Sequence, residues 1–180
     1  GGSLKITAKK EGNDYTSARI KTQGLYDFTY GRVEVRAKLP ASQGTWPAIW
    51  MLGSNHPTVG WPYSGEVDIM EQRGDDKERV LGTSHWYNTA GSNNASYGES
   101  TTVENPSTEF HLYTVEWTEG AVKIFLDDVK YYELTNSADL PFNADFYLIL
   151  NVAMGGTLGG DIDPSFTQDT MEIDYIKVFQ

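Results

Sequence analysis

The chain consists mainly of short segments in which apolar and polar residues alternate, separated by Gly, Pro, Asn and Asp. In the segment 31–39, for example, Val33, Val35, Ala37 and Leu39 share one face. A period of two is typical of half-buried β-strands. This pattern predicts about ten strands, in the segments 3–9, 15–21, 31–39, 47–52, 65–71, 79–86, 111–118, 122–134, 146–154 and 171–179.

Two of these segments carry further information. Segment 122–134 is typical of a hairpin that turns at Asp127 and Asp128, and 146–154 is continuously apolar, like a strand buried on both faces. No amphipathic helix of useful length and no internal repeat is evident. The sequence therefore predicts an all-β fold, a β-sandwich or jelly roll, in a single domain over residues 1–180.

Three loops stand out between the predicted strands. Loop 54–65 carries Trp61 and leads directly into segment 65–71, and loop 88–108 is a long polar connection. Loop 155–163 is dense in glycine, and we expect it to shape the wall of a cleft. It is not a phosphate-binding loop, because no Lys-Ser/Thr pair and no helix follow it.

Charge and composition limit the class of partner. The formal net charge is −11, which argues against binding to nucleic acid and favours a neutral partner. The chain has no cysteine, so disulfides and thiolate metal sites are excluded. No apolar run approaches the roughly 20 residues that a membrane-spanning helix needs, and the opening GGSLKITAKK does not resemble a signal peptide.

The sequence GEVDIMEQ, residues 65–72, contains three carboxylates with irregular spacing. In a regular strand Glu66 and Asp68 would share one face and Glu71 would point to the other, where Val67 and Ile69 are buried. An unpaired carboxylate there would cost several kcal/mol. A β-bulge near Ile69 and Met70 would restore the phase, so we expect all three acids on one face.

This arrangement suggests a reaction. With one residue absorbed by the bulge, Glu66 and Glu71 would stand about 13 Å apart at the backbone, with carboxyl groups about 5 to 6 Å apart. Retaining glycosidases place a nucleophile and an acid/base about 5 to 5.5 Å apart. Asp68 could hold Glu66 by a hydrogen bond and help to keep a proton on Glu71. The alternative is that the three acids line a solvated strand face.

The same residues resemble the active-site signature E-x-D-x-x-E of glycoside hydrolase family 16, in the bulged form found in laminarinases. The likeness extends over nearly the whole chain, through YTSARIKT, YGRVEVRAKLP, GTWPAIWMLG, GTSHW, FHLYTVEWT, LILNVAMGG and MEIDYIKVFQ. It implies a curved β-jelly-roll sandwich of two antiparallel sheets with an open cleft on the concave face. It also implies retaining hydrolysis with Glu66 as nucleophile, Asp68 as its orienting partner and Glu71 as acid/base.

The resemblance also suggests residues that bind substrate. His85 matches a family histidine on the strand beside the acids, where it could bond a sugar hydroxyl or Glu71, or be purely structural. Trp46, Trp50 and Trp61 resemble cleft tryptophans, since aromatic faces pack against pyranose rings; Trp50 reads equally well as core. Arg19 and Asn151 complete the candidates, each with a plain structural alternative. Trp86 and Trp117 are left as structural or unassigned.

Two predictions concern metals. Some family members bind calcium on the convex side, where Asp174 occupies a similar position, but one carboxylate cannot supply the 6 to 8 oxygens required. A structural calcium is thus a weak expectation, and no cofactor is expected for catalysis. A metal-dependent enzyme built on His85 and the acids is disfavoured because His56, His85 and His111 lie on unrelated segments.

The predicted activity is endo-hydrolysis of neutral β-1,3-glucans such as laminarin, without nucleic acid or membrane insertion and with no oligomeric state predicted. The alternatives are a mixed-linkage β-1,3-1,4-glucanase of the same family and a non-catalytic glycan-binding module. A polymeric substrate implies a secreted or cell-surface protein. Family members usually carry a segment before the equivalent of 3–9 that lines the glycone end of the cleft, and this chain is expected to lack it.

Overall fold

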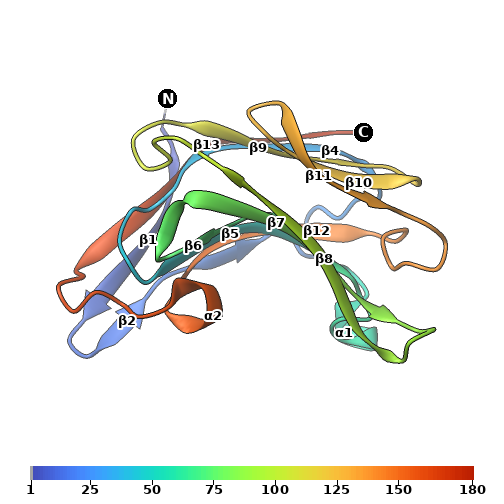
Figure 1. Ribbon diagram of the computed structural model, residues 1–180, viewed down its shortest axis with the longest axis horizontal. Coiled ribbons are helices and arrows are strands. Elements are labelled where there is room, and N and C mark those ends of the chain that lie inside the picture. Colours follow the sequence, from blue (N-terminus) through green and yellow to red (C-terminus); the bar gives the residue numbers. More distant parts are fainter. Residues whose placement is uncertain (1) are drawn as a thin grey trace.

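A computed structural model describes residues 2–180 as two packed antiparallel sheets. The seven-stranded sheet has the order β11-β10-β9-β4-β13-β1-β2, and the six-stranded sheet has the order β3-β12-β5-β6-β7-β8. Figure 1 shows the six-stranded sheet arched beneath the other, with α1 and α2 on its lower side, near opposite ends. The predicted jelly-roll sandwich is confirmed.

The strands of the seven-stranded sheet are β1 (Leu4–Glu11), β2 (Asp14–Thr16), β4 (Gly31–Lys38), β9 (His111–Trp117), β10 (Ala121–Leu126), β11 (Val129–Thr135) and β13 (Gln168–Phe179). Those of the six-stranded sheet are β3 (Arg19–Lys21), β5 (Thr45–Gly53), β6 (Glu66–Arg73), β7 (Asp76–Asn88), β8 (Asn93–Thr102) and β12 (Phe146–Met154). The helices are single turns, α1 (His56–Val59) and α2 (Gly156–Gly159). No described helix is long and apolar enough to cross a membrane.

The main core lies between the two sheets, and alternation places its side chains there. On β4 the apolar residues Val33, Val35 and Ala37 are buried while the intervening charged residues face outward. Trp117 is also buried and donates its indole N–H to the carbonyl oxygen of Phe142 at 2.9 Å. Trp86 meets the Phe142 ring edge-on, with centroids 6.2 Å apart. Both tryptophans left unassigned by the sequence therefore support the core.

Strand β12 is buried on both faces, as its continuous apolar sequence predicts. Leu148 and Leu150 belong to the main core, whereas Tyr147 and Ile149 form a second cluster with Leu52 on the opposite face of the sheet. The hairpin prediction is also confirmed, because Asp127 and Asp128 connect β10 to β11 with φ angles of 48° and 64°. These left-handed conformations suit a tight turn between twisted strands.

Two sequence predictions were wrong. The predicted strand 15–21 is divided into β2 and β3, which join different sheets, so the chain crosses between layers at this point. The polar connection 88–108 contains β8, a ten-residue strand at the edge of the six-stranded sheet. Its residues are almost all exposed, so it lacks the apolar alternation that reveals a half-buried strand.

Candidate active site

The three acids of β6 lie at a bulge. Strand β5 pairs Ile49 with Met70 and Trp50 with Asp68, which leaves Ile69 without a partner. Against β7 the register likewise shifts by one between Asp68 and Glu71. Ile69 and Met70 are both fully buried, so the extra residue is absorbed in the core. The bulge expected from the spacing of the acids is confirmed.

The bulge brings Glu66, Asp68 and Glu71 into one hollow of about 210 Å³ on the concave face of the six-stranded sheet. Four strands contribute to its walls: β3, β12, β5 and β6. Its lining consists of Arg19, Trp46, Ala48, Trp50, Glu66, Asp68, Glu71, Asn151 and Ala153. Four of the six substrate-binding candidates therefore line the hollow together with all three acids. The solvated-face alternative does not hold for Asp68, which is 4% exposed.

Burial dominates the electrostatics of these acids. Within residues 2–180 none of the three forms an ion pair with a Lys or Arg, and His85 is the only basic side chain within 4 Å of the carboxylate oxygens of Glu66 and Asp68. Loss of hydration raises the pKa of Glu66 to about 8, and the charge of Asp68 contributes to this rise. Burial also raises the pKa of Asp68 and of Glu71. The site therefore retains protons at a pH where exposed carboxyl groups have lost them.

Trp46 supports Glu71 directly. Its indole Nε1–H donates a hydrogen bond of 2.9 Å to Oε1 of Glu71, which opposes the effect of burial on the pKa of that carboxyl group. The glycine-rich segment lies behind the indole. A Cβ atom added to Gly156 would come within 3.4 Å of the Trp46 ring, and one added to Gly159 would lie 3.0 Å from a backbone oxygen of Gly44. Segment 155–163 thus packs against Trp46, but none of its residues lines the hollow, so it affects the cleft wall only through this indole.

Trp50, Asn151 and Arg19 form a second supported group in the hollow. The indole Nε1–H of Trp50 donates to Oδ1 of Asn151 at 2.8 Å, and the guanidinium of Arg19 lies 5.3 Å from the ring centroid of Trp50. Trp50 also packs against the small cluster that contains Leu52. Trp50 was predicted either to line the cleft or to belong to the core, and both predictions are partly right. Its side chain is half-buried and it lines the hollow.

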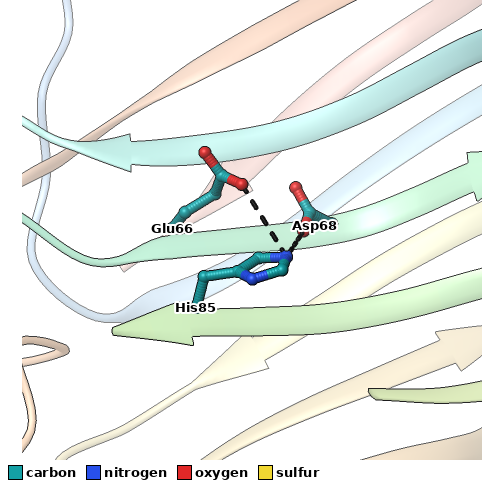
Figure 2. Close-up of side chains that lie close together, drawn as sticks. All are labelled: Glu66, Asp68 and His85. Atoms are coloured by element: carbon teal, nitrogen blue, oxygen red, sulfur yellow. Dashed lines mark ion pairs between the residues drawn. The ribbon is translucent and has the colours of Figure 1, made fainter. Parts of the chain in front are cut away.

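His85 lies opposite Glu66 in the register of β6 and β7. Its Nε2 atom is 3.2 Å from Oδ2 of Asp68 and 3.9 Å from Oε1 of Glu66 (Figure 2). The expected contact with Glu71 is therefore replaced by contacts with the other two acids. Trp61 is 47% exposed and lies just outside the hollow, with its ring centroid 6.1 Å from that of His85.

Some features of the site were missed in the sequence. Ala48 and Ala153 line the hollow, and small side chains at these positions leave room between Trp46 and Trp50. Tyr87 follows His85 by two positions on β7 and stacks on Tyr63, with ring centroids 4.2 Å apart. Alternation along β7 predicts that His85 and Tyr87 share a face, but without the position of Tyr63 it does not predict the stacking.

The metal predictions have different outcomes. Asp174 is exposed on β13 and pairs with Nη1 of Arg36 at 2.7 Å. Among residues 2–180, the only group of three or more His, Cys, Asp or Glu side chains suited to a metal ion is Glu66, Asp68 and His85. The side chains around Asp174 therefore do not form a calcium site by themselves, and calcium stays a prediction. The sequence argument against a metal site rested on the separation of the three histidines, and it did not consider that one histidine could join two acids.

Comparison with known proteins places this site in a family. The sequence profile of Glycosyl hydrolases family 16 matches residues 1–177. The chain belongs to this family. The β-glucanase of Rhodothermus marinus is 41% identical over 197 residues, which span 100% of this chain and 68% of that protein.

Solved structures of family members are similar throughout. LamAcat from Zobellia galactanivorans has a TM-score of 0.92 and 48% identity, covering 99% of this chain and 77% of that one. SCLam has a TM-score of 0.89 and 40% identity, covering 100% of this chain and 72% of that one. Longer relatives also match: the chain spans 28% of the clotting factor G alpha subunit of Tachypleus tridentatus and 26% of the glucan endo-1,3-beta-glucosidase A1 of Niallia circulans.

Proposed function

We propose that this family 16 glycoside hydrolase is a retaining endo-β-1,3-glucanase whose catalytic residues are Glu66, Asp68 and Glu71. The observation that carries the proposal is the bulge, which places two glutamates of one strand in the same hollow with a buried aspartate between them. Intact acids in a shared hollow favour catalysis over a purely glycan-binding module.

The proposed reaction has two displacements at the anomeric carbon. In the first, the Glu66 carboxylate forms a bond to this carbon while Glu71 gives its proton to the departing glycosidic oxygen. In the second, Glu71 takes a proton from water, and the water oxygen replaces Glu66 at the same carbon. Two inversions at one centre return the original β configuration.

The surroundings of Glu71 suit its proposed role, whereas those of Glu66 act in both directions. Burial favours the protonated form of Glu71, which the first step requires, and the Trp46 indole limits this effect so that the proton can leave. Burial opposes the ionised form of Glu66 that attack requires, and the interaction with His85 acts in the other direction. Because Glu66, Asp68 and Glu71 interact, their protons are lost as a group, and the productive state has Glu66 ionised and Glu71 protonated.

The remaining residues form a surface suited to a neutral sugar chain. The rings of Trp46, Trp50 and Trp61 offer apolar faces for pyranose C–H groups, and Arg19 and Asn151 offer polar atoms beside them. A variant of the Zobellia galactanivorans protein has been crystallised with laminaritriose and laminaritetraose, and it is 47% identical to this chain. This likeness supports a β-1,3-linked substrate here.

A second candidate is hydrolysis of mixed-linkage β-1,3-1,4-glucan. SCLam is described as a non-specific endo-β-1,3(4)-glucanase and has the same fold and 40% identity. In either case the substrate is a polymer outside the cell, so we propose a secreted or cell-surface protein that needs no cofactor for catalysis.

The test is release of reducing sugar from laminarin and from barley mixed-linkage glucan, with Glu66→Ser as the control. We expect release from laminarin with the β anomer formed first, and a loss of at least about 10³-fold in the variant, because the nucleophile is absent. Release only from mixed-linkage glucan would favour the second candidate. Release of the α anomer first, or an active Glu66→Ser variant, would contradict the proposed mechanism.

A further inference from the structure

Three side chains in the hollow direct ligand atoms toward one point. They are Nε2 of His85 on β7 and one carboxylate oxygen each of Glu66 and Asp68 on β6, and all three atoms lie within 4.8 Å of one another (Figure 2). Imidazole nitrogen and carboxylate oxygen are common ligands of zinc-class ions in proteins. The proposed glucanase mechanism uses Glu66 as the nucleophile and Asp68 as its orienting partner, and it does not require the three side chains to hold a metal ion.

The distances can be compared with what a metal ion requires. Zn²⁺ binds His nitrogen and carboxylate oxygen at about 2.0 to 2.2 Å, and tetrahedral geometry then sets adjacent ligand atoms about 3.3 to 3.5 Å apart. In the protein, Nε2 of His85 is 3.2 Å from Oδ2 of Asp68 and 3.9 Å from Oε1 of Glu66. The remaining edge, between the carboxylate oxygens of Glu66 and Asp68, is as long as 4.8 Å, so Glu66 would have to move by about 1 Å or more toward the other two ligands to complete one face of a tetrahedron.

An independent observation is a buried carboxylate oxygen that makes no hydrogen bond. Oδ2 of Asp68, the atom closest to His85, is buried and has no hydrogen-bond partner of its own. No Lys or Arg forms an ion pair with Glu66 or Asp68 in residues 2–180. A buried carboxylate oxygen that is unpartnered is costly, and coordination of a cation would satisfy it.

We propose that Glu66, Asp68 and His85 form a binding site for a divalent zinc-class ion, which holds the enzyme in a reversibly inactive state. The ion would occupy the carboxylate that must attack the sugar and the space that the sugar must enter, so metal and substrate exclude each other. Binding itself depends only on the three ligands. The inhibitory part rests on the proposed function.

Binding is tested by calorimetric titration of the metal-free protein with Zn²⁺. We expect one equivalent to bind, at least tenfold more weakly after His85→Gln, because one of three ligands is lost. His56→Gln is the matched control, since His56 lies on α1 outside the hollow, and it should bind as the unaltered protein does. Equal affinity in the unaltered protein and His85→Gln would overturn the site.

A second variant tests another ligand, and thermal unfolding separates loss of metal binding from loss of folding. Asp68→Asn keeps the shape of the side chain and removes its charge, and it should also weaken Zn²⁺ at least tenfold. Thermal unfolding of each variant without metal shows that it is folded. Replacement of Zn²⁺ by Co²⁺ should give an intense tetrahedral visible absorption in the unaltered protein, and a weak octahedral spectrum would contradict the predicted geometry.

Inhibition is measured separately. With laminarin well below its KM, Zn²⁺ should lower the rate of hydrolysis with a midpoint equal to the calorimetric dissociation constant, and EDTA should restore the rate. Laminaritetraose should weaken Zn²⁺ binding to the inactive Glu71→Gln variant, which keeps all three ligands. Tight binding with unaltered hydrolysis would overturn the inhibitory part, whereas tight binding in a protein inactive on every β-glucan would count against the proposed function alone.

Discussion

The two sheets of this protein use acidic residues in opposite ways. On the outer face of the seven-stranded sheet, Arg32 is bonded to Glu34 at 2.8 Å, to Glu116 at 2.7 Å and to Asp128 at 3.1 Å. On the concave face of the six-stranded sheet, Glu66 and Asp68 have only a histidine nearby. Carboxyl groups on β-strands are thus paired and solvated in one layer, and buried without a fixed cation in the other.

The pKa values follow this difference. On the outer face the Ser3 hydroxyl and the Lys38 ammonium group lower the pKa of Glu172, whereas burial raises that of Glu66 to about 8. The outer pairs are partly accessible to solvent, and each contributes little to stability, typically between 0 and about 1 kcal/mol. The inner acids reduce stability when ionised, which is the usual cost of a preorganised active site. The acids that contribute least to stability are those proposed to perform the chemistry.

The largest expected effect concerns the pH dependence of stability. The folded-state pKa of Glu66, about 8, lies above its ordinary value of 4.5. Its protonated form therefore adds to the free energy of unfolding fully below pH 4.5, and this stabilisation is lost as pH rises through about 8. At about 1.4 kcal/mol per pH unit, this loss amounts to a few kcal/mol. Glu66→Gln cannot ionise, so denaturant unfolding should show a smaller fall in stability between pH 5 and pH 9 than in the unaltered protein.

Glu172→Gln is the opposite case from the outer sheet. The folded-state pKa of Glu172 lies below its ordinary value of 4.5. The ionised side chain therefore stabilises the folded protein above pH 4.5, and this stabilisation is lost as pH falls through the lowered pKa of the folded state. The variant should therefore be slightly less stable than the unaltered protein at neutral pH and equal to it in acid. If both variants changed stability in the same direction at pH 8, the contrast between the two sheets would be refuted.

A smaller effect is expected when Trp46 is replaced by Phe. The change removes the N–H that stabilises the charged form of Glu71, so the pKa of Glu71 should rise. A hydrogen bond to a charged group contributes about 1.5 to 3 kcal/mol, which corresponds to roughly one to two pKa units. If Glu71 is the acid, the alkaline limb of kcat/KM on laminarin should shift to higher pH by about one unit.

Trp50→Phe provides the matched control for this shift. Its indole donates to the neutral amide of Asn151 instead of an acid, so the variant should raise KM and leave the alkaline limb in place. A similar shift in both variants would indicate a general effect of the indoles on the hollow.

The smallest effect is expected on the outer sheet at Asp174. Asp174→Asn breaks an exposed ion pair with Arg36 and should cost less than about 1 kcal/mol by thermal unfolding. EDTA should leave Tm unchanged in both proteins. A rise in Tm with Ca²⁺ that the variant loses would contradict this expectation and support the calcium prediction.

Periodicity in the sequence was sufficient to predict most of the fold. Alternation located β4, β9 and β13, and continuous apolarity identified β12 as buried on both faces. Strand β8 could not be found in this way because both of its faces are polar, and its place in the sheet follows from ten pairings with β7. The split between β2 and β3 was hidden because the segment alternates through the point at which the chain changes layer.

The arrangement of the three acids was predictable because their spacing departs from the alternation of a regular strand. Glu71 falls out of phase with Glu66 and Asp68, and the cost of burying it predicted the bulge before any pairing was known. The contacts of His85 were not predictable, because register between β6 and β7 determines which acid it faces. The stacking of Tyr63 on Tyr87 depends in the same way on how a loop folds back over a strand.

The bulge at Ile69 also affects how chains of different length can carry the same site. Removal of Ile69 or Met70 would leave the acids at intervals of two, and a regular strand would then present all three on one face without a bulge. Removal of Val67 would instead reverse the orientation of Glu66 relative to its neighbours. An insertion or deletion is thus tolerated at one point of this strand. A sequence alignment that omits a gap at this point would pair Glu71 with the wrong residue.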